Sequence, residues 1–443
     1  MKNKIAYILM IFIFMLGSCE YLDYNEEDYF EKADIFENAG RTGNVLNGIY
    51  GELPDGFNEI SGSMRASAAD NAEEANSLSL IQAMNDGRWS ATQPVDANWQ
   101  DMYSGIRSAN MLLKNHDPSV LDDRRYNDDY YEQLTHYHMY DDQARFLRAY
   151  FYFELMRRYG GVPLLDGKVL RLSEVNDVQP NSFQEVKDFI VSECNVAIDS
   201  LPASYLDITG FTPEASIGRA TKGAAMALKA RTLLYAASPL HGSSQEEWAR
   251  AAEAAHAIID SGWYSLDANY SDAFNNSRSN GLIMGRRHGE SNDFEAANFP
   301  IGFEGADPGT CPTQNLVNTY EMSNGKDIDE SGSGYDPNNP YENRDPRLKQ
   351  TVIVNNSMWK GRNVEIWRGG VDGPPIDRAT PTGYYLKKYV QEQASMDPDN
   401  PATARHLWVY FRYAEVLLNY AEAMNEAYGP TNANGYSMTA VEA

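Results

Sequence analysis

Two consecutive alanine-rich segments constrain the fold of this chain most strongly. The first, TKGAAMALKARTLLYAASPL, spans residues 221–240, and the second, SQEEWARAAEAAHAIIDSG, spans residues 244–262. Alanine is the strongest helix former, and small residues at helical spacing allow two helix backbones to approach closely. Because only the short stretch SPLHGSS joins them, we expect two antiparallel helices that pack against each other.

Other segments show the same helical periodicity. Residues 95–115, 141–163 and 182–202 each place apolar side chains on one face, and Ser182 with Glu185 forms a capping box. The segments 141–158 and 182–200 could form a second pair. A helix–turn–helix of this length is the unit of tetratricopeptide arrays. The repeat is degenerate, so a plain helical bundle remains the alternative.

From about residue 263 to 405 the chain changes character. Glycine, asparagine, aspartate and proline become frequent, and helical periodicity fades. We expect a loop-rich region with a few short strands such as LKQTVIV. Residues 408–429 are predicted to form a closing helix. The final YSMTAVEA resembles the start of another helix, so a further segment is expected to follow.

The N-terminus carries an export signal. Lys2 and Lys4 precede an apolar run over residues 5–16, which is too short to span a bilayer and suits a signal peptide. The run ends in Leu-Gly-Ser-Cys, the order of a bacterial lipobox, so Cys19 is the predicted lipidation site. An ordinary signal peptide with a chance cysteine is the alternative. The acidic residues up to about Phe30 are expected to form a polar tether.

Charge and cysteine content exclude several classes of function. The 37 Lys and Arg residues against 63 Asp and Glu residues give a net charge of −26. This balance argues against a nucleic-acid partner and against docking on anionic lipid. The three cysteines lack zinc-site spacing, and Cys194 lies in an apolar-periodic segment where a small buried side chain is expected.

A resemblance to a known family rests on an ordered set of motifs that covers nearly the whole chain. They are the lipobox, WQDMYSGIRSAN, ARFLRAYFYFELMRRYGGVPLL, ATKGAAMALKARTLLYAASP, TQNLVNTYEMSNGKDID, SGYDPNNPYENRDPRL, PTGYYLKKYV and FRYAEVLLNYAEAMNEA. In these stretches the chain resembles the SusD/RagB family, surface lipoproteins that work with outer-membrane nutrient importers.

This resemblance implies an all-α, tetratricopeptide-like helical scaffold that carries an irregular loop-rich lobe with a few short strands. It divides the chain into a signal peptide (1–18), a helical region (19–262) and a loop-rich region with the closing helix (263–443). It implies a lipid-anchored, extracellular-facing, glycan-binding lid on a SusC-like TonB-dependent transporter, without cofactor or catalysis. The alternatives are a peptide-binding member of the same family or a glycoside hydrolase, for which no nucleophile elbow or metalloprotease motif is found.

The first candidate for a glycan site is QAMNDGRWS. Trp89 lies in a polar loop beside Asn85, Asp86 and Arg88, and sugar sites pair exposed aromatic rings with such hydrogen-bonding groups. The family often places a sugar-stacking tryptophan in this region, before its WQDMY helix. The alternative is a tryptophan that anchors the loop in the core.

Other tryptophans and one acidic stretch complete the candidates. Trp367 and Trp359 lie in loops and are further possible glycan contacts, whereas Trp99, Trp248 and Trp408 lie on helical patterns and are expected in the core. A weaker candidate is a calcium site, since Asp327, Asp329 and Ser331 alternate as in a calcium loop. The twelfth position holds Asn338 in place of the bidentate glutamate, which argues against an EF-hand.

Overall fold

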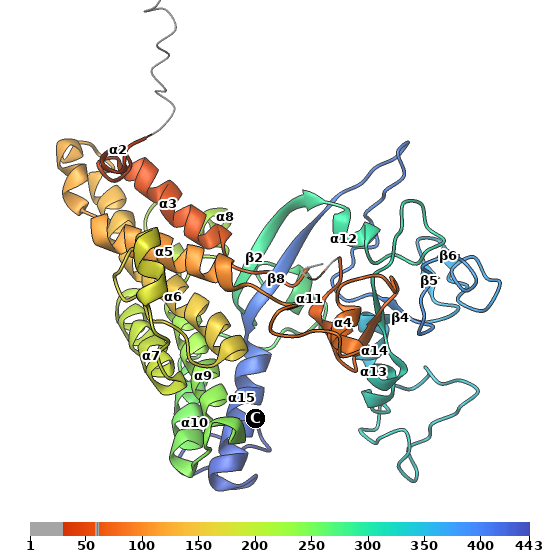
Figure 1. The fold of residues 1–443 in the computed structure, drawn as a ribbon. Helices are drawn as coiled ribbons and strands as arrows, with labels where there is room; N and C mark the ends of the chain where they lie inside the picture. The colour runs from red at the N-terminus through yellow and green to blue at the C-terminus, as the bar shows by residue number, and fades with distance from the viewer. Residues whose placement is uncertain (1–29, 58–59, 61) are drawn as a thin grey trace, which may run out of the picture.

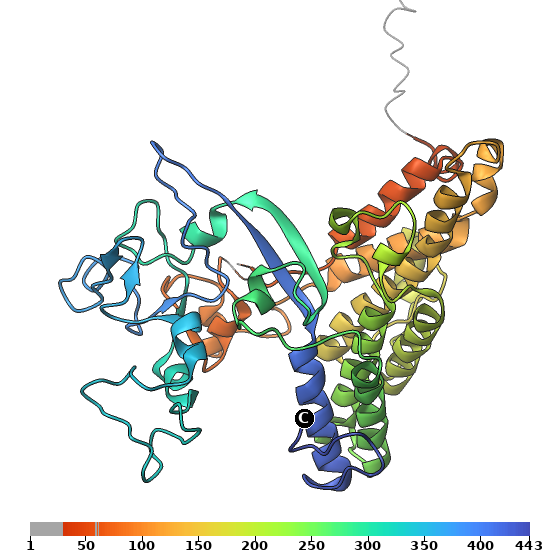
Figure 2. The same cartoon turned by 180° about the vertical axis from the view of Figure 1, so that it is seen from behind.

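The computed structural model describes residues 30–57, 60 and 62–443, and these form two lobes (Figure 1). One lobe is a stack of long helices, and the other is an irregular assembly of loops, short helices and short strands. A long antiparallel ribbon, β2 (Leu282–Ser291) paired with β8 (Ala404–Arg412), lies between them in both views (Figures 1 and 2). The expected all-α scaffold with an irregular lobe is confirmed.

The helical scaffold is built from antiparallel neighbours. Its long helices are α3 (Ala39–Gly51), α5 (Trp99–Asn115), α6 (Tyr130–Tyr159), α7 (Phe183–Ser200), α9 (Lys222–Ala237), α10 (Gln245–Asp260) and α15 (Tyr413–Tyr428). Shorter elements decorate them: α2 (Lys32–Phe36), η2 (Pro118–Arg124), η3 (Leu172–Asp177), η4 (Tyr205–Asp207), α8 (Pro213–Ser216) and η5 (Pro239–His241). Helix α9 packs on α10 and α6 packs on α7, which confirms the two predicted helix pairs.

Local signals in the sequence explain where these helices begin. The hydroxyl groups of Ser182, Thr221 and Ser244 each accept a hydrogen bond from a backbone N–H of the first helical turn. The Glu185 side chain in turn accepts a hydrogen bond from the Ser182 N–H at 2.8 Å, so the predicted capping box is present. Cys194 is fully buried on α7, as expected.

A buried ion pair ties three scaffold helices together. Arg148 on α6 donates from Nε and Nη2 to Glu193 Oε2 on α7, at 2.8 and 2.6 Å. Its Nη1 donates to Asn110 Oδ1 on α5 at 2.6 Å. Because all three side chains are buried, these bonds satisfy polar groups that would be costly to leave unpaired.

The irregular lobe combines residues from two distant parts of the chain. Its elements are η1 (Arg65–Ala68), β1 (Ala72–Glu74), α4 (Gln82–Asn85), α11 (Asp272–Asn275), α12 (Asp293–Ala296), β3 (Thr310–Pro312), α13 (Gln314–Thr319), α14 (Pro346–Thr351), β4 (Val352–Ile353), β5 (Met358–Trp359), β6 (Arg362–Asn363) and β7 (Tyr385–Leu386). The pairings are β1 with β3, β4 with β7 and β5 with β6, all antiparallel. A separate apolar core supports this lobe, with Phe294, Phe299 and Tyr385 among its members.

The lobes therefore do not follow the order of the chain. The segment 62–98 lies in the irregular lobe although it precedes most of the scaffold, and α15 lies on the scaffold although it follows the loop-rich region. The division into 19–262 and 263–443 remains a prediction about sequence regions, since strand pairing and helix packing cross it.

Three predicted elements were placed wrongly. Residues 408–412 extend strand β8, because their aromatic and β-branched side chains pair with β2 before the helix begins at Tyr413. Helix α6 begins at Tyr130, eleven residues before the predicted start at residue 141. In LKQTVIV the first residues belong to α14, because Asp345 caps a helix that begins at Pro346, and the strand is limited to Val352–Ile353.

Candidate functional site

The structure presents Trp89 at the surface of the irregular lobe. This residue follows α4, and its side chain is 53% exposed. Its backbone is fixed, because the Trp89 N–H donates to the Ala83 carbonyl at 3.2 Å and Ser90 and Gln93 exchange two backbone hydrogen bonds. An indole held in this way at the surface can stack on the apolar face of a ring without an ordering cost in the loop.

The polar residues predicted beside Trp89 differ in how many hydrogen-bonding groups they leave free for a ligand. Asn85 Nδ2 donates to the Ser67 carbonyl at 2.9 Å, so this amide also fastens α4 to η1. Arg88 Nε donates to Asp86 Oδ2 at 2.6 Å, and both side chains are solvent-exposed. That hydrogen bond lowers the pKa of Asp86 below its ordinary value. The pair is neutral as a unit and leaves further donors and acceptors facing solvent beside the indole.

Trp367 is a second exposed indole on an anchored loop. It is 47% exposed. The loop turns tightly, with the Gly370 N–H donating to the Trp367 carbonyl at 2.8 Å. Arg362 then clamps it through a bidentate pair with the fully buried Asp372, at 2.6 and 2.7 Å.

Trp359 is a core residue, which corrects its prediction as a glycan contact. Only 1% of it is exposed, and its ring lies edge-on to Phe299 at a centroid distance of 5.8 Å. The hairpin of β5 with β6 directs this side chain into the core of the irregular lobe. A glycine-containing stretch suggested a loop, but the two-residue strand places the indole inside.

The acidic stretch proposed for calcium is organised around a lysine. Lys326 Nζ lies 2.9 Å from Glu330 Oε1 and donates to the Ser331 carbonyl at 2.8 Å. Across residues 30–57, 60 and 62–443, no group of three or more histidine, cysteine or acidic side chains is arranged to hold a metal ion. Asp327, Asp329 and Ser331 therefore remain a prediction without geometric support.

The sequence did not predict a groove that lies on the scaffold. Trp99, expected in the core, is 42% exposed and lines a groove of about 360 Å³ with Tyr103, Arg107 and Lys168. Its ring lies 4.8 Å from that of Tyr103. The signal that could have revealed it is position: Trp99 is the first residue of α5, at the end of the helix, and its ring packs on Tyr159, the last residue of α6.

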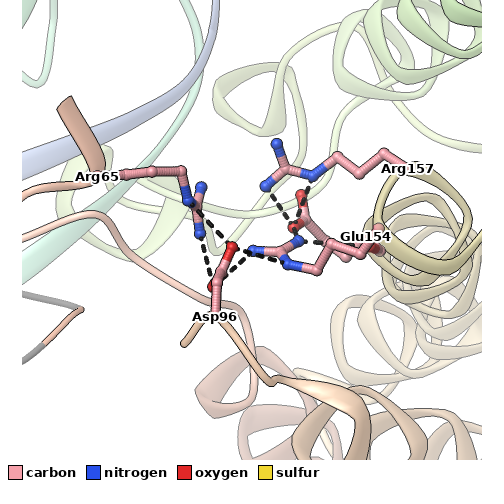
Figure 3. Close-up of polar contacts among 5 residues, drawn as sticks. Arg65, Asp96, Glu154 and Arg157 are labelled. Atoms are coloured by element: carbon pink, nitrogen blue, oxygen red, sulfur yellow. Dashed lines mark hydrogen bonds and ion pairs between the residues drawn. The ribbon is translucent and has the colours of Figure 1, made fainter. Parts of the chain in front are cut away.

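A charged network fastens the segment carrying Trp89 to the scaffold (Figure 3). Asp96 Oδ2 lies 3.3 Å from Arg65 Nε and 3.1 Å from Nε of Arg158, on α6. Arg158 also pairs with Glu154, which accepts from Arg157 Nη2 at 2.6 Å. Trp89 lies between Arg65 and Asp96 in the chain. The network therefore holds the loop of Trp89 in position against the scaffold.

The electrostatics of this network favour ionised carboxylates. Burial acts to raise the pKa of Glu154, but the guanidinium groups of Arg157 and Arg158 outweigh it and hold that pKa below its ordinary value. Burial likewise opposes the ionisation of Asp96, and Arg158 with Arg65 reverses the effect, so its pKa is also lowered. Both carboxylates have structural partners, and neither is positioned as a general acid or base.

The predicted lipidation site, Cys19, lies outside the described residues. Within the described part of the chain, no helix has both the length and the apolar character required to cross a membrane.

Comparison with known proteins now identifies the family. A model described as "Starch-binding associating with outer membrane" matches residues 20–234, and a model described as "SusD family" matches residues 262–441. Among curated proteins, SusD-like protein P25 of Formosa agariphila is 24% identical over 98% of this chain and 80% of its own. SusD-like protein P2 of the same organism is 22% identical over 96% of this chain and 78% of its own.

Solved structures give the same result for the fold. A SusD-like carbohydrate binding protein from Bacteroides fragilis superposes with a TM-score of 0.71 at 24% identity, covering 90% of this chain and 76% of that one. Surface glycan-binding protein A from Bacteroides uniformis superposes with a TM-score of 0.62 at 18% identity, covering 89% and 77%. With two family models matching successive parts of its length, the chain belongs to the SusD/RagB family of carbohydrate-binding, non-catalytic proteins associated with the outer membrane.

Proposed function

We propose that this protein is the glycan-receptor subunit of an outer-membrane importer, anchored by lipid on Cys19 and facing the extracellular side. Its partner would be a SusC-like TonB-dependent transporter, over which it would act as a lid. The lipobox motif and the family support the anchor and the partner. The observation that carries glycan binding is the half-exposed indole of Trp89 on a backbone-fixed loop.

The proposed binding mode uses stacking for affinity and polar groups for orientation. The indole of Trp89 would cover the C–H face of a pyranose ring, with Asp86 and Arg88 bonding its hydroxyl groups and Asn85 holding α4 in place. Trp367 is a second platform of the same kind. Both loops are already held by hydrogen bonds, so little conformational entropy would be lost on binding.

Isothermal titration of the purified protein against a panel of neutral and charged polysaccharides tests this proposal. We expect saturable binding of at least one glycan, without release of reducing ends. Binding of peptides alone would favour the peptide-binding alternative, and turnover of a glycan would favour a hydrolase. Co-purification from outer membranes with a TonB-dependent transporter tests the proposed partner, and recovery of the protein without one would contradict it.

A further inference from the structure

A polar cavity of about 330 Å³ lies where the scaffold meets the β2–β8 ribbon. Helix α3, the segment after α8, and the ribbon all reach this place, and they lie close together in both views (Figures 1 and 2). The polar side chains that line the cavity are Asn47, Tyr50, Arg219, Arg286, Arg287 and Tyr410. None of the candidate residues named from the sequence belongs to it.

Within the part of the chain that the structure describes, the cavity collects positive charge without a lining carboxylate. Arg219 donates to the Ala215 carbonyl at 3.0 Å and to the Gln143 side-chain oxygen at 3.3 Å, both neutral acceptors. Arg286 donates to the Leu53 carbonyl at 2.7 Å, and its acidic neighbour Asp55 lies 3.9 Å away. In a chain of net charge −26, a cavity lined by three guanidinium groups and by no acid among the described residues is a local reversal of sign.

Two side chains of the lining have unused hydrogen-bonding capacity. The Arg287 backbone pairs with Leu407 in the ribbon, but its exposed side chain makes no hydrogen bond or ion pair with any residue that the structure describes. Tyr410 is buried, with 5% of its surface exposed; its hydroxyl lies beside the Arg286 guanidinium but makes no hydrogen bond of ordinary length and angle within residues 30–57, 60 and 62–443. A buried hydroxyl without a partner costs free energy, and a ligand oxygen would satisfy it.

We propose that this cavity binds the anionic substituent of a saccharide, a uronate carboxylate or a sulfate ester. Guanidinium groups match both anions because their paired N–H donors meet two oxygens at once. The cavity volume falls at the lower end of the range for small-molecule sites. The inference rests on the proposed glycan-binding function and adds the ligand class: an acidic glycan, held at the junction of the two lobes.

Titrations with chemically matched ligands test the proposal. One pair is oligogalacturonate and its methyl ester, and the other is a sulfated galactan oligosaccharide and its desulfated form. We expect the charged member of one pair to bind about 10-fold or more tightly than its neutral partner, with a preference that weakens as salt rises. Which pair shows the preference distinguishes a carboxylate ligand from a sulfate ligand.

Variants of the lining residues test whether the preference for the charged ligand arises in this cavity. Arg287→Gln should remove most of the preference and leave thermal stability unchanged, because the exposed side chain has no partner among the residues that the structure describes. Tyr410→Phe should weaken binding of the charged ligand several-fold with little change in stability, since the hydroxyl makes no hydrogen bond of ordinary geometry within the described residues. Arg405→Gln is the matched control: it removes the same charge from the same ribbon at an exposed ion pair outside the cavity and should preserve the preference.

The outcomes separate this inference from the function on which it rests. Equal binding of charged and neutral members in both pairs, or a preference that survives Arg287→Gln and Tyr410→Phe, overturns the anion site while neutral glycan binding stands. Absence of binding to every glycan tested overturns both.

Discussion

At the scale of single residues, the exposure of each tryptophan separates binding candidates from core. Trp89 and Trp367 present about half of their surface on loops whose backbones are pinned, whereas Trp248 and Trp359 are buried in the two cores. Composition and periodicity could propose Trp89 because its neighbours are polar. They could not separate Trp359 from it, because a two-residue strand decides that case and local sequence carries little signal for so short an element.

Replacing Trp89 tests the binding mode directly. Trp89→Ala removes the stacking surface, and we expect glycan affinity to fall about 10-fold, corresponding to roughly 1–1.5 kcal/mol. Trp263→Ala is the control, because Trp263 is 43% exposed but follows α10 on the scaffold. Equal losses from the two variants, measured by isothermal titration, would contradict a specific role for Trp89.

Glu154 is the residue on which the charged network depends. Glu154→Gln removes the buried charge that compensates Arg157 and Arg158, and we expect the free energy of unfolding to fall by roughly 2–3 kcal/mol. Urea denaturation measures this change. Glu290→Gln, at an exposed pair with Arg405, should change stability by less than about 0.5 kcal/mol. Similar effects of the two substitutions would show that the network adds little.

The same carboxylates predict how stability depends on pH. The pKa values of Glu154 and Asp96 are lowered in the folded state, so their contribution is fully present above the ordinary carboxyl pKa and is lost as pH falls through the folded values. The stability difference between the parent protein and Glu154→Gln should therefore be constant from pH 6 to 8 and shrink below about pH 4.5. A difference that grows on acidification, in urea titrations across this range, would contradict the assignment.

At the scale of elements, the effect of replacing a helical glycine depends on what lies next to that position. A Cβ on Gly105 of α5 would lie 2.5 Å from the ring of the fully buried Phe151 on α6. Alanine would gain about 1 kcal/mol of helix propensity, but the clash in a rigid core costs about 1–3 kcal/mol. We expect Gly105→Ala to lower the thermal midpoint. Gly48→Ala on α3, where a Cβ meets nothing within 4 Å, should raise stability by about 0.5–1 kcal/mol. The opposite signs make the comparison a test of α5–α6 packing.

The helices were predictable from the sequence, whereas the ribbon was not. Capping residues and apolar periodicity locate α7, α9 and α10 within one to three residues of their observed bounds. In the sequence, residues 408–412 continue the apolar periodicity of a helix. Their conformation is decided by pairing with β2, which lies more than a hundred residues earlier, and no local signal reports such a partner.

At the scale of the whole molecule, the chain passes back and forth between the two lobes. The ribbon and the charged network of Figure 3 join them. The network ties the segment of Trp89 to the helical scaffold, whereas the Trp367 loop is held within the irregular lobe by Arg362 and Asp372. The Trp89 loop could be proposed from sequence, but the arginine-lined cavity could not, because its residues come from four separate segments that only the fold brings together.

The proposed anchor makes its own prediction for the intact protein. Cys19→Ser should release the protein from the outer-membrane fraction, since no other lipid attachment site is proposed and stable anchoring requires acyl chains. Cell fractionation with immunoblotting measures this, and Asn25→Gln serves as the control in the same tether. Retention of the serine variant in the membrane fraction would contradict lipid anchoring at Cys19.

The central claim is that the irregular lobe binds glycan through the loop of Trp89. Hydrogen–deuterium exchange of the protein, with and without a saturating concentration of a polysaccharide that binds it, tests this claim most directly. We expect slower exchange over residues 82–93, and also over 366–371 if both indoles engage, with α10 and α15 unchanged. Protection confined to the scaffold helices, with residues 82–93 unaffected at saturation, would contradict it.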